Sequence, residues 1–451
     1  MDYEDTANQS ISDEEMESDD DLIPESEDDE DEERSKGRVY LPGCEIGEDY
    51  DSRPSKMVVD ESVYIMLHKA HTGAPCLSFD ILKDALGDKR ESYPMTNYIV
   101  AGTQAERSHT NAVIVMKLSN MYRFKEAKVG EESEEESDDE EGADKSKAPV
   151  LSAATIKHPL GAVNRIRASS VGDVPVAASW CERGIVYIWN LKDPLAALSD
   201  SHMLSEHNKQ SKTKPQHLLQ EFNGHGVEGF AMDWSSVVQG QLLTGDCNKN
   251  IHLWRPHDDA SWIVDQRSFV GHTASVEDIQ WSPNEATVFA SCSVDKSIRI
   301  WDIRVPPSKA CMLTAPEAHE RDVNVISWNT NEPFILSGGD DGLIKVWELR
   351  QFKTGKPVAL FKHHTSAITS VAWHPTDGSV FGASGADNQI TLWDLAVEQD
   401  DEAEQLDVPP QLLFIHQGQS DIKEIHWHKQ CPGVMISTAH SGFNVFRTIS
   451  V

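Results

Sequence analysis

The sequence predicts an all-β chain built from radially repeated sheets, because pairs of large aromatic residues recur in it at a fixed spacing. The two members of each pair stand 19 or 20 residues apart. The pairs are Trp234/Trp254, Trp281/Trp301, Trp328/Trp347, Trp373/Trp393 and Trp427/Phe446. Their second members recur after 46, 47 or 53 residues, with Gly-His early and Trp-Asp late in the clearest copies. This period and these motifs indicate a WD-repeat β-propeller.

The number of blades follows from counting the repeats. Five clear repeats occupy residues 222–451, and a degenerate one precedes them between His158 and Asn190. Strand-like runs at 77–81, 97–102 and 112–116 predict one further blade. We therefore expect seven blades over residues 75–451, with an N-terminal strand pairing with the C-terminal strands so that no sheet edge is left free.

Histidine and aspartate recur at fixed places in the repeats, ahead of the first strand and in the turn before the third. Recurrence in several blades favours a structural role over catalysis, with a buried His–Asp hydrogen bond backed by a serine and a tryptophan. In the third of these repeats, either Asp340 or Asp341 fits. The residues assigned this role are His225, Asp246, Trp254, His272, Asp295, Trp301, His319, Trp347, His364, Asp387 and Trp393.

The chain ahead of the repeats divides into two segments. Residues 1–36 are rich in charge and poor in apolar side chains, so we expect a disordered acidic tail. Residues 37–74 contain an expected α-helix at 60–71, capped by Asp60 and ended by Gly73 and Pro75. The propeller itself is expected to carry an acidic loop at 125–149, a polar insertion at 192–219 and an acidic loop at 398–410.

The net charge of −35 is concentrated in short runs. Residues 1–33 hold 18 Asp/Glu and residues 131–141 hold nine, without any Lys or Arg, which leaves −8 for the rest of the chain. Such runs repel nucleic-acid phosphates and favour basic protein partners, although solvated solubility tails are the simpler interpretation. Serines followed by an acidic residue three positions later are candidate phosphorylation sites: Ser12, Ser18, Ser26, Ser133 and Ser137.

Other classes of function find little support in the sequence. It contains no phosphate-binding loop, zinc spacing or nucleophile elbow, so we expect no enzyme activity, no metal site and no cofactor. The seven cysteines lack a framework spacing and predict reduced thiols in an intracellular protein. We expect neither a signal peptide nor a membrane span.

An acidic loop that runs into Pro409-Pro410, together with the expected helix, resembles the retinoblastoma-binding, chromatin-assembly class of histone-binding WD proteins. In that family an N-terminal helix and such a loop form a groove for a basic amphipathic helix. The resemblance implies one wall from Tyr64, Leu67 and His68, and a floor shaped by Pro409, Pro410 and Leu412. It assigns contacts with partner Arg or Lys to Asp400, Asp401, Glu402 and Glu404.

Within that class, the chain is most similar to the glutamate-rich WD-repeat proteins. The similarity rests on the acidic N-terminus, residues 73–80 and 101–106, the acidic insert and the repeats. It implies a protein of the nucleus and nucleolus that acts in ribosome biogenesis on pre-ribosomal particles. The implied client is a basic ribosomal protein of the large subunit, and some members bind histones.

Besides a chromatin-assembly, histone-binding scaffold, two further alternatives remain, one of them a substrate receptor of a ubiquitin ligase. The sequence Ile300-Trp301-Asp302-Ile303-Arg304 matches the WDxR box of proteins that dock onto the adaptor of a cullin–RING ubiquitin ligase, through Asp302 and Arg304. A weaker match ends at Arg350. The second alternative is an RNA-binding scaffold, which the overall charge disfavours. Lys209, Lys212 and Lys214 of the polar insertion could serve nuclear import or contact RNA, and a solvated loop is the simpler interpretation.

Overall fold

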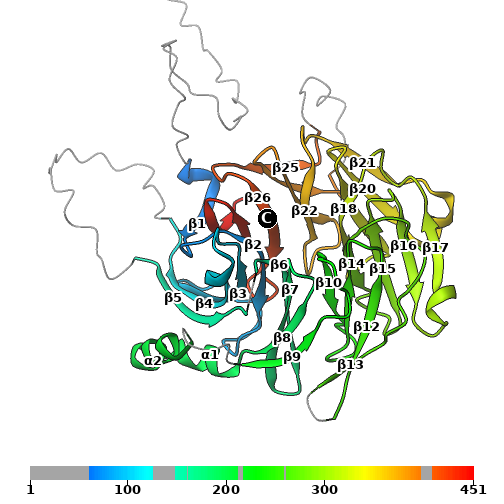
Figure 1. The fold of residues 1–451 in the computed structure, drawn as a ribbon. Coiled ribbons are helices and arrows are strands. Elements are labelled where there is room, and N and C mark those ends of the chain that lie inside the picture. The colour runs from blue at the N-terminus through cyan, green and yellow to red at the C-terminus, as the bar shows by residue number, and fades with distance from the viewer. Residues whose placement is uncertain (1–59, 125–147, 160, 212–216, 259–260, 398–408) are drawn as a thin grey trace, which may run out of the picture. The chain divides into compact units, whose positions relative to one another are not determined.

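The computed structural model describes residues 60–124, 148–159, 161–211, 217–258, 261–397 and 409–451. Within these ranges the strands form seven four-stranded antiparallel sheets. The first strand of each sheet packs against the first strand of the next, in the order β2, β6, β10, β14, β18, β22, β26 and back to β2. This closed circle is a seven-bladed β-propeller and confirms the predicted fold class (Figure 1).

The first three blades contain the degenerate repeats and the first clear one. Blade 1 consists of β2 (Cys76–Leu82), β3 (Met95–Thr103), β4 (Ala112–Met121) and β5 (Val150–Lys157). Blade 2 consists of β6 (Val163–Val171), β7 (Val174–Cys181), β8 (Val186–Asn190) and β9 (Leu218–Phe222). Blade 3 consists of β10 (Ala231–Trp234), β11 (Leu242–Gly245), β12 (Ile251–Pro256) and β13 (Trp262–Val264).

The next three blades follow the WD repeat closely. Blade 4 consists of β14 (Val276–Trp281), β15 (Val288–Ser293), β16 (Ile298–Asp302) and β17 (Cys311–Ala315). Blade 5 consists of β18 (Val323–Trp328), β19 (Phe334–Gly339), β20 (Leu343–Glu348) and β21 (Ala359–Lys362). Blade 6 consists of β22 (Ile368–Trp373), β23 (Val380–Gly385), β24 (Ile390–Asp394) and β25 (Leu412–His416).

The closing blade joins the two ends of the described chain. It consists of β26 (Ile422–Trp427), β27 (Val434–Ala439), β28 (Gly442–Thr448) and β1 (Tyr64–Ala70). Strand β1 pairs antiparallel with β28, and Leu67 lies opposite Phe446. The expected pairing of an N-terminal strand with C-terminal strands is thus present, as Figure 1 shows for the blue strand beside the red ones.

The α-helix expected at 60–71 is wrong. Asp60 does cap a helical turn, by accepting a hydrogen bond from the Ser62 amide, but this is a single 3-10 turn, η1 (Glu61–Val63). Residues from Tyr64 onward form β1 instead. Their apolar side chains suit either structure, and the free edge of β28 decides in favour of a strand because its backbone groups need partners.

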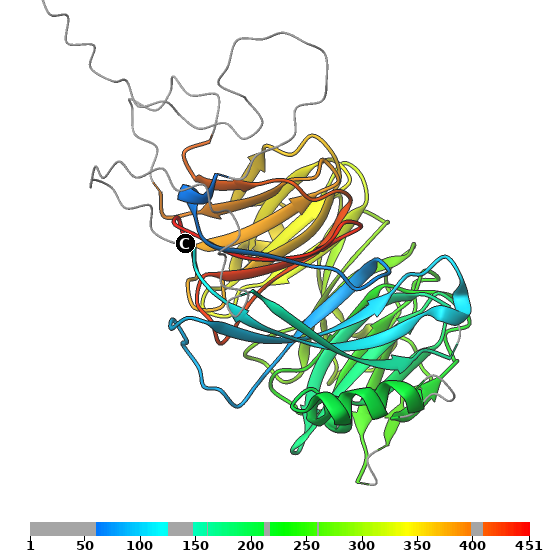
Figure 2. The same cartoon turned by 90° about the vertical axis from the view of Figure 1, so that its left-hand side faces the viewer.

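The polar insertion after β8 is largely helical, which the sequence did not predict. It forms α1 (Lys192–Ala197) and α2 (Ser201–Ser211), and α2 packs against β5 (Figure 2). Asn208 accepts a hydrogen bond from the Thr155 amide and donates one to the Ala153 carbonyl, so the helix covers part of this sheet edge. The other short helices are η2 (Ser108–Thr110), η4 (Pro307–Lys309) and η5 (Leu349–Thr354). In the described part of the chain, no helix is long and apolar enough to cross a membrane.

Blades 3 to 6 each contain a buried network of histidine, aspartate, a hydroxyl and tryptophan. In blade 4, His272 Nδ1 lies 2.9 Å from the Asp295 carboxylate and its Nε2 lies 2.7 Å from Ser291 Oγ. The Trp301 indole donates to the same hydroxyl at 2.8 Å. Blade 5 makes the same contacts, with Asp341 rather than Asp340 as the partner of His319. The equivalent groups of blades 3 and 6 are His225/Asp246/Thr244/Trp254 and His364/Asp387/Thr391/Trp393.

The closing blade replaces this network with one that also anchors β1. Phe446 stacks on the His416 imidazole at a centroid distance of 4.2 Å. The Asn444 amide nitrogen lies 3.0 Å from His416 Nε2, and the Tyr64 hydroxyl lies 2.7 Å from Nδ1. Because an amide nitrogen can only donate, Nε2 accepts and Nδ1 donates to the tyrosine oxygen, which requires a neutral imidazole. Burial accordingly lowers the pKa of His416 to about 3.

The buried carboxylate of Glu424 connects the inner strands of three neighbouring blades. Glu424 on β26 accepts from the Phe79 amide of blade 1 at 2.9 Å. It also accepts from Arg165 at 2.8 Å and from Arg167 at 2.6 Å, both in blade 2. Arg165 in turn donates through Nε to the Phe230 carbonyl just before blade 3. One side chain thereby joins the closing blade to the two blades that follow it. Burial opposes its ionisation, but the two arginines and His426 hold its pKa well below the usual range.

We expect Glu424→Gln to destabilise the propeller strongly. The amide keeps the shape but removes the carboxylate that contacts both guanidinium groups directly, and leaves Asp278 as a nearby negative charge. Breaking such a buried pair costs about 3 kcal/mol. The measurement is urea unfolding followed by tryptophan fluorescence. Glu221→Gln, on the exposed face of β9, is the matched control and should stay within about 0.5 kcal/mol of the unsubstituted protein. Equal midpoints for the two variants would contradict this role of Glu424.

His416 should make stability depend on pH. Its folded pKa of about 3 lies below the ordinary value of 6.5, so the unfolded chain binds a proton that the folded chain excludes. The contribution of His416 to the free energy of unfolding is fully present above pH 6.5 and is lost as the pH falls toward 3. At about pH 5.5 the loss amounts to about 1.4 kcal/mol.

The check compares the unsubstituted protein with His416→Gln, whose side chain does not titrate, in urea at about pH 7.5 and pH 5.5. The difference in free energy of unfolding between the two proteins should be smaller at about pH 5.5 than at about pH 7.5, by about 1.4 kcal/mol. A pH-independent difference would show that His416 is not kept neutral by the fold.

Candidate functional site

Strand β1 supplies the residues expected on one groove wall, but its two faces point to different blades. Tyr64 packs edge-on against Phe414 of β25 at 5.3 Å, and Leu67 belongs to the same apolar cluster. His68 lies on the opposite face, where its Nε2 is 2.8 Å from the Tyr122 carbonyl. Burial lowers the pKa of His68. The structure therefore brings Tyr64 and Leu67 together at the junction with blade 6 and places His68 at the junction with blade 1.

The Pro-Pro segment leads directly into the strand that Tyr64 contacts. Pro409 accepts a hydrogen bond from the Leu412 amide at 3.0 Å, which forms a turn ahead of β25. Pro409 and Pro410 are half-buried, and Leu412 packs with Trp393 inside blade 6. The expected partner-facing acids Asp400, Asp401, Glu402 and Glu404 lie outside the described residues, as do the five candidate phosphorylation serines and Lys212 and Lys214. Lys209 lies on α2, 3.1 Å from Glu206.

The points at which the acidic segments join the ring form a pattern. The run at 131–141 lies between β4 and β5, and a run with six Asp/Glu at 398–407 lies between β24 and β25. The N-terminal run precedes β1. Along the chain, each segment therefore precedes the outermost strand of a blade, the N-terminal run at a distance of 30 residues. The three blades concerned, blade 6, the closing blade and blade 1, are consecutive. Because all blades have the same strand order, these entries share one face of the ring.

Strand β1 connects these three entry points by direct contacts. The Phe124 amide, just before the second acidic segment, donates to the Ile65 carbonyl at 3.0 Å. Tyr64 contacts Phe414 and His416 of β25, the strand that follows the third segment. Neither Phe124 nor Phe414 was identified from the sequence. The Tyr64-Ile65-Met66-Leu67 run could have predicted both contacts, because as a strand of the closing blade it lies between the ends of blade 1 and blade 6.

The WDxR residues lie at the end of β16 in blade 4. The Arg304 guanidinium donates to the Asp302 carboxylate through Nε at 2.9 Å and Nη2 at 2.6 Å. The Arg304 side chain is nevertheless 70% exposed, so the aspartate orients it without covering it. In the weaker copy, Glu348 accepts from Gln351 at 2.8 Å instead. The two motifs therefore differ: among the described contacts, an aspartate two residues earlier orients Arg304, whereas Glu348 pairs with Gln351 and not with Arg350.

Two known protein families match this chain, one at β1 and blade 1 and the other at the later repeats. The family described as histone-binding protein RBBP4 or a subunit of the CAF1 complex matches residues 55–122, which contain β1 and most of blade 1. The WD domain, G-beta repeat family matches residues 264–302, 310–348 and 355–394.

Similar proteins cover nearly the entire chain. It is 43% identical to the Arabidopsis thaliana protein HEAT STRESS TOLERANT DWD 1, over 92% of each chain. It is 40% identical to the Schizosaccharomyces pombe ribosome assembly protein rrb1, over 91% of this chain and 84% of the relative. It is 41% identical to the Dictyostelium discoideum glutamate-rich WD repeat-containing protein 1, over 86% of this chain and 81% of the relative. With this identity over most of its length and a complete WD propeller, the chain belongs to the family of glutamate-rich WD-repeat proteins that includes rrb1.

Proposed function

We propose that this protein is a non-enzymatic chaperone that holds a basic client polypeptide during ribosome biogenesis, in the nucleus and nucleolus. The leading client is a basic ribosomal protein of the large subunit, and histones are the second. The observation that carries the proposal is that three acidic segments precede, along the chain, the outer strands of three consecutive blades. The similarity to a protein named for ribosome assembly supports a role in ribosome biogenesis.

The mechanism follows from charge and geometry. Acidic segments attached around β1 raise the local concentration of a cationic chain and speed its capture. The ring supplies a preformed surface, because the innermost strand of each blade packs on that of the next, and Glu424 adds polar contacts among three of these blades. Ribosomal RNA, with its higher density of negative charge, would then compete for the client and release it. Association should accordingly weaken as the salt concentration rises.

Contact residues are proposed around β1. Tyr64 and Leu67 supply an aromatic and an aliphatic surface beside β25, while Pro409 and Pro410 define where the third acidic segment returns. Asp400, Asp401, Glu402 and Glu404 would pair with Arg or Lys of the client. His68 and Leu412 act indirectly, since one fastens β1 to the end of blade 1 and the other fastens β25 to blade 6.

A second candidate function is docking to the adaptor of a cullin–RING ubiquitin ligase. The exposed and oriented guanidinium of Arg304 favours it, as does similarity to a relative whose name contains DWD. Blade 4, which carries Arg304, is not among the three blades that carry the acidic segments. Both functions could therefore operate on one propeller without competing for the same residues.

Removing residues 1–36 should weaken client capture without abolishing it. The deletion takes away 18 acidic residues but leaves the described ring and two acidic segments intact. In a tagged pull-down from nuclear extract at about 150 mM salt, we expect one dominant large-subunit ribosomal protein, reduced roughly threefold to tenfold by the deletion. A broad histone or adaptor profile that is unchanged by the deletion would contradict the chaperone proposal.

Arg304→Ala tests the second function separately. Loss of the guanidinium should abolish co-purification of the ligase adaptor, because a docking arginine supplies several directed hydrogen bonds at once. Arg350→Ala is the matched control and should leave the adaptor signal unchanged. Capture of the basic client should persist in both variants. Adaptor recovery equal to that of the unsubstituted protein would rule out docking through this motif.

A further inference from the structure

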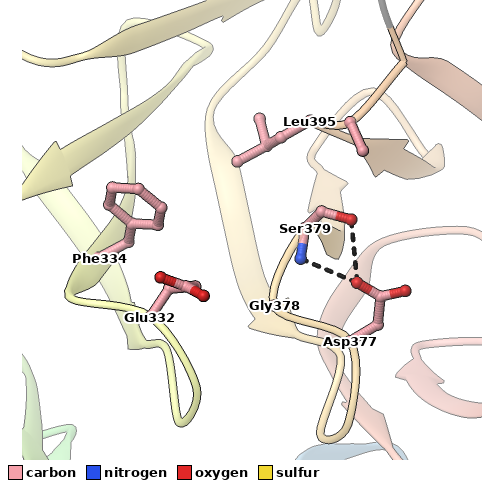
Figure 3. A pocket seen from close by; sticks show the side chains of 7 residues that line it. Glu332, Phe334, Asp377, Gly378, Ser379 and Leu395 are labelled. Atoms are coloured by element: carbon pink, nitrogen blue, oxygen red, sulfur yellow. Dashed lines mark hydrogen bonds between the residues drawn. The ribbon is translucent and has the colours of Figure 1, made fainter.

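A hollow of about 420 Å³ lies between blades 5 and 6. Figure 3 shows Glu332 and Phe334 on one side of it and Asp377, Gly378 and Leu395 on the other. Glu332 lies in the loop between β18 and β19, Asp377 in the loop between β22 and β23, and Leu395 directly after β24. These loops emerge on the face from which the acidic segment 398–407 also departs, because the strand order is the same in every blade.

The lining combines an apolar floor with two carboxylates. Phe334 stacks on Trp373 at a centroid distance of 6.5 Å, and Leu395 packs on the same cluster. Asp377 accepts from the amide and the hydroxyl of Ser379, each at 2.9 Å, and these bonds lower its pKa and keep it ionised at neutral pH. Within the described part of the chain, no lysine or arginine forms an ion pair with Glu332 or Asp377.

The two rims are fastened to each other, so the hollow is preformed. Asn329 accepts hydrogen bonds from the Asn331 and Glu332 amides and donates to the Gly378 carbonyl at 2.8 Å. Glu332 also lies close over Gly378, where a Cβ would come within 3.0 Å of its Cγ. These contacts fix the carboxylate-bearing loops before any ligand arrives, which lowers the entropic cost of binding.

We propose that this hollow binds the side chain of an arginine or lysine from a basic polypeptide. The aliphatic stem would pack on Phe334 and Leu395 while the charged head reaches Glu332 or Asp377. The Phe334 ring adds an attractive face for a cation. The inference deepens the proposed function, since it assigns one specific pocket to the basic client beside the diffuse attraction of the acidic segments.

The test uses the full-length protein and a fluorescein-labelled peptide of about twelve residues with four arginines separated by serines. Glu332→Gln combined with Asp377→Asn removes both charges and keeps oxygen acceptors, so the Ser379 turn is preserved. Ala396→Trp fills the hollow without changing its charge, from an exposed position. The matched control, Glu182→Gln combined with Glu221→Gln, removes two exposed charges from blade 2.

At about 150 mM salt, fluorescence anisotropy should show a Kd about fivefold to tenfold higher for both hollow variants and less than twofold higher for the control. Circular dichroism and melting temperature confirm that each variant folds.

If the hollow variants bind as the control does, the inference is wrong and the proposed function stands. If only Ala396→Trp weakens binding, the occupant is apolar, which also overturns the inference. If the unsubstituted protein does not bind the cationic peptide, both the inference and the proposed function fail.

Discussion

The pairing of β1 with β28 is the contact on which the rest of this structure depends. It completes the closing blade with a strand that stands more than 350 residues earlier in the sequence, so β28 is not left as an unpaired edge. Glu424 reinforces the same junction from the centre, where it reaches blade 1 and blade 2 at once. His416 reinforces it from the outside through Tyr64. Closure is therefore held at both the inner and the outer radius of the ring.

The same junction lies next to residues that adjoin the acidic segments along the chain. Strand β1 follows the first segment, contacts Phe124 just ahead of the second and packs on β25 just after the third. A chain with this charge spread evenly would attract a basic client without favouring any orientation. Here the acidic segments join three consecutive blades, so the attraction is strongest on one sector of the ring. Localised charge of this kind guides the encounter with an oppositely charged partner.

The sequence predicted the repeating part of this fold and not its exceptions. The tryptophan spacing and the recurring His and Asp identified the blades, because each repeat obeys the same local constraints. The segment 60–71 was assigned to a helix because its apolar residues fit both periods, and only the distant edge of β28 makes it a strand. The contacts of Glu424 with Arg165 and Arg167 were equally invisible, since they join single residues of separate blades. The acidic residues expected in the candidate groove, at 400–404, lie outside the residues that the structure describes.

On the proposed function, a basic client is held on the sector formed by blade 6, the closing blade and blade 1. Cross-linking mass spectrometry of the purified complex with a large-subunit ribosomal protein tests it most directly, with a reagent that joins carboxyl groups to lysine. We expect cross-links from the acidic segments and from residues of these three blades. Cross-links concentrated on blades 2 to 4, with few from the acidic segments, would contradict it.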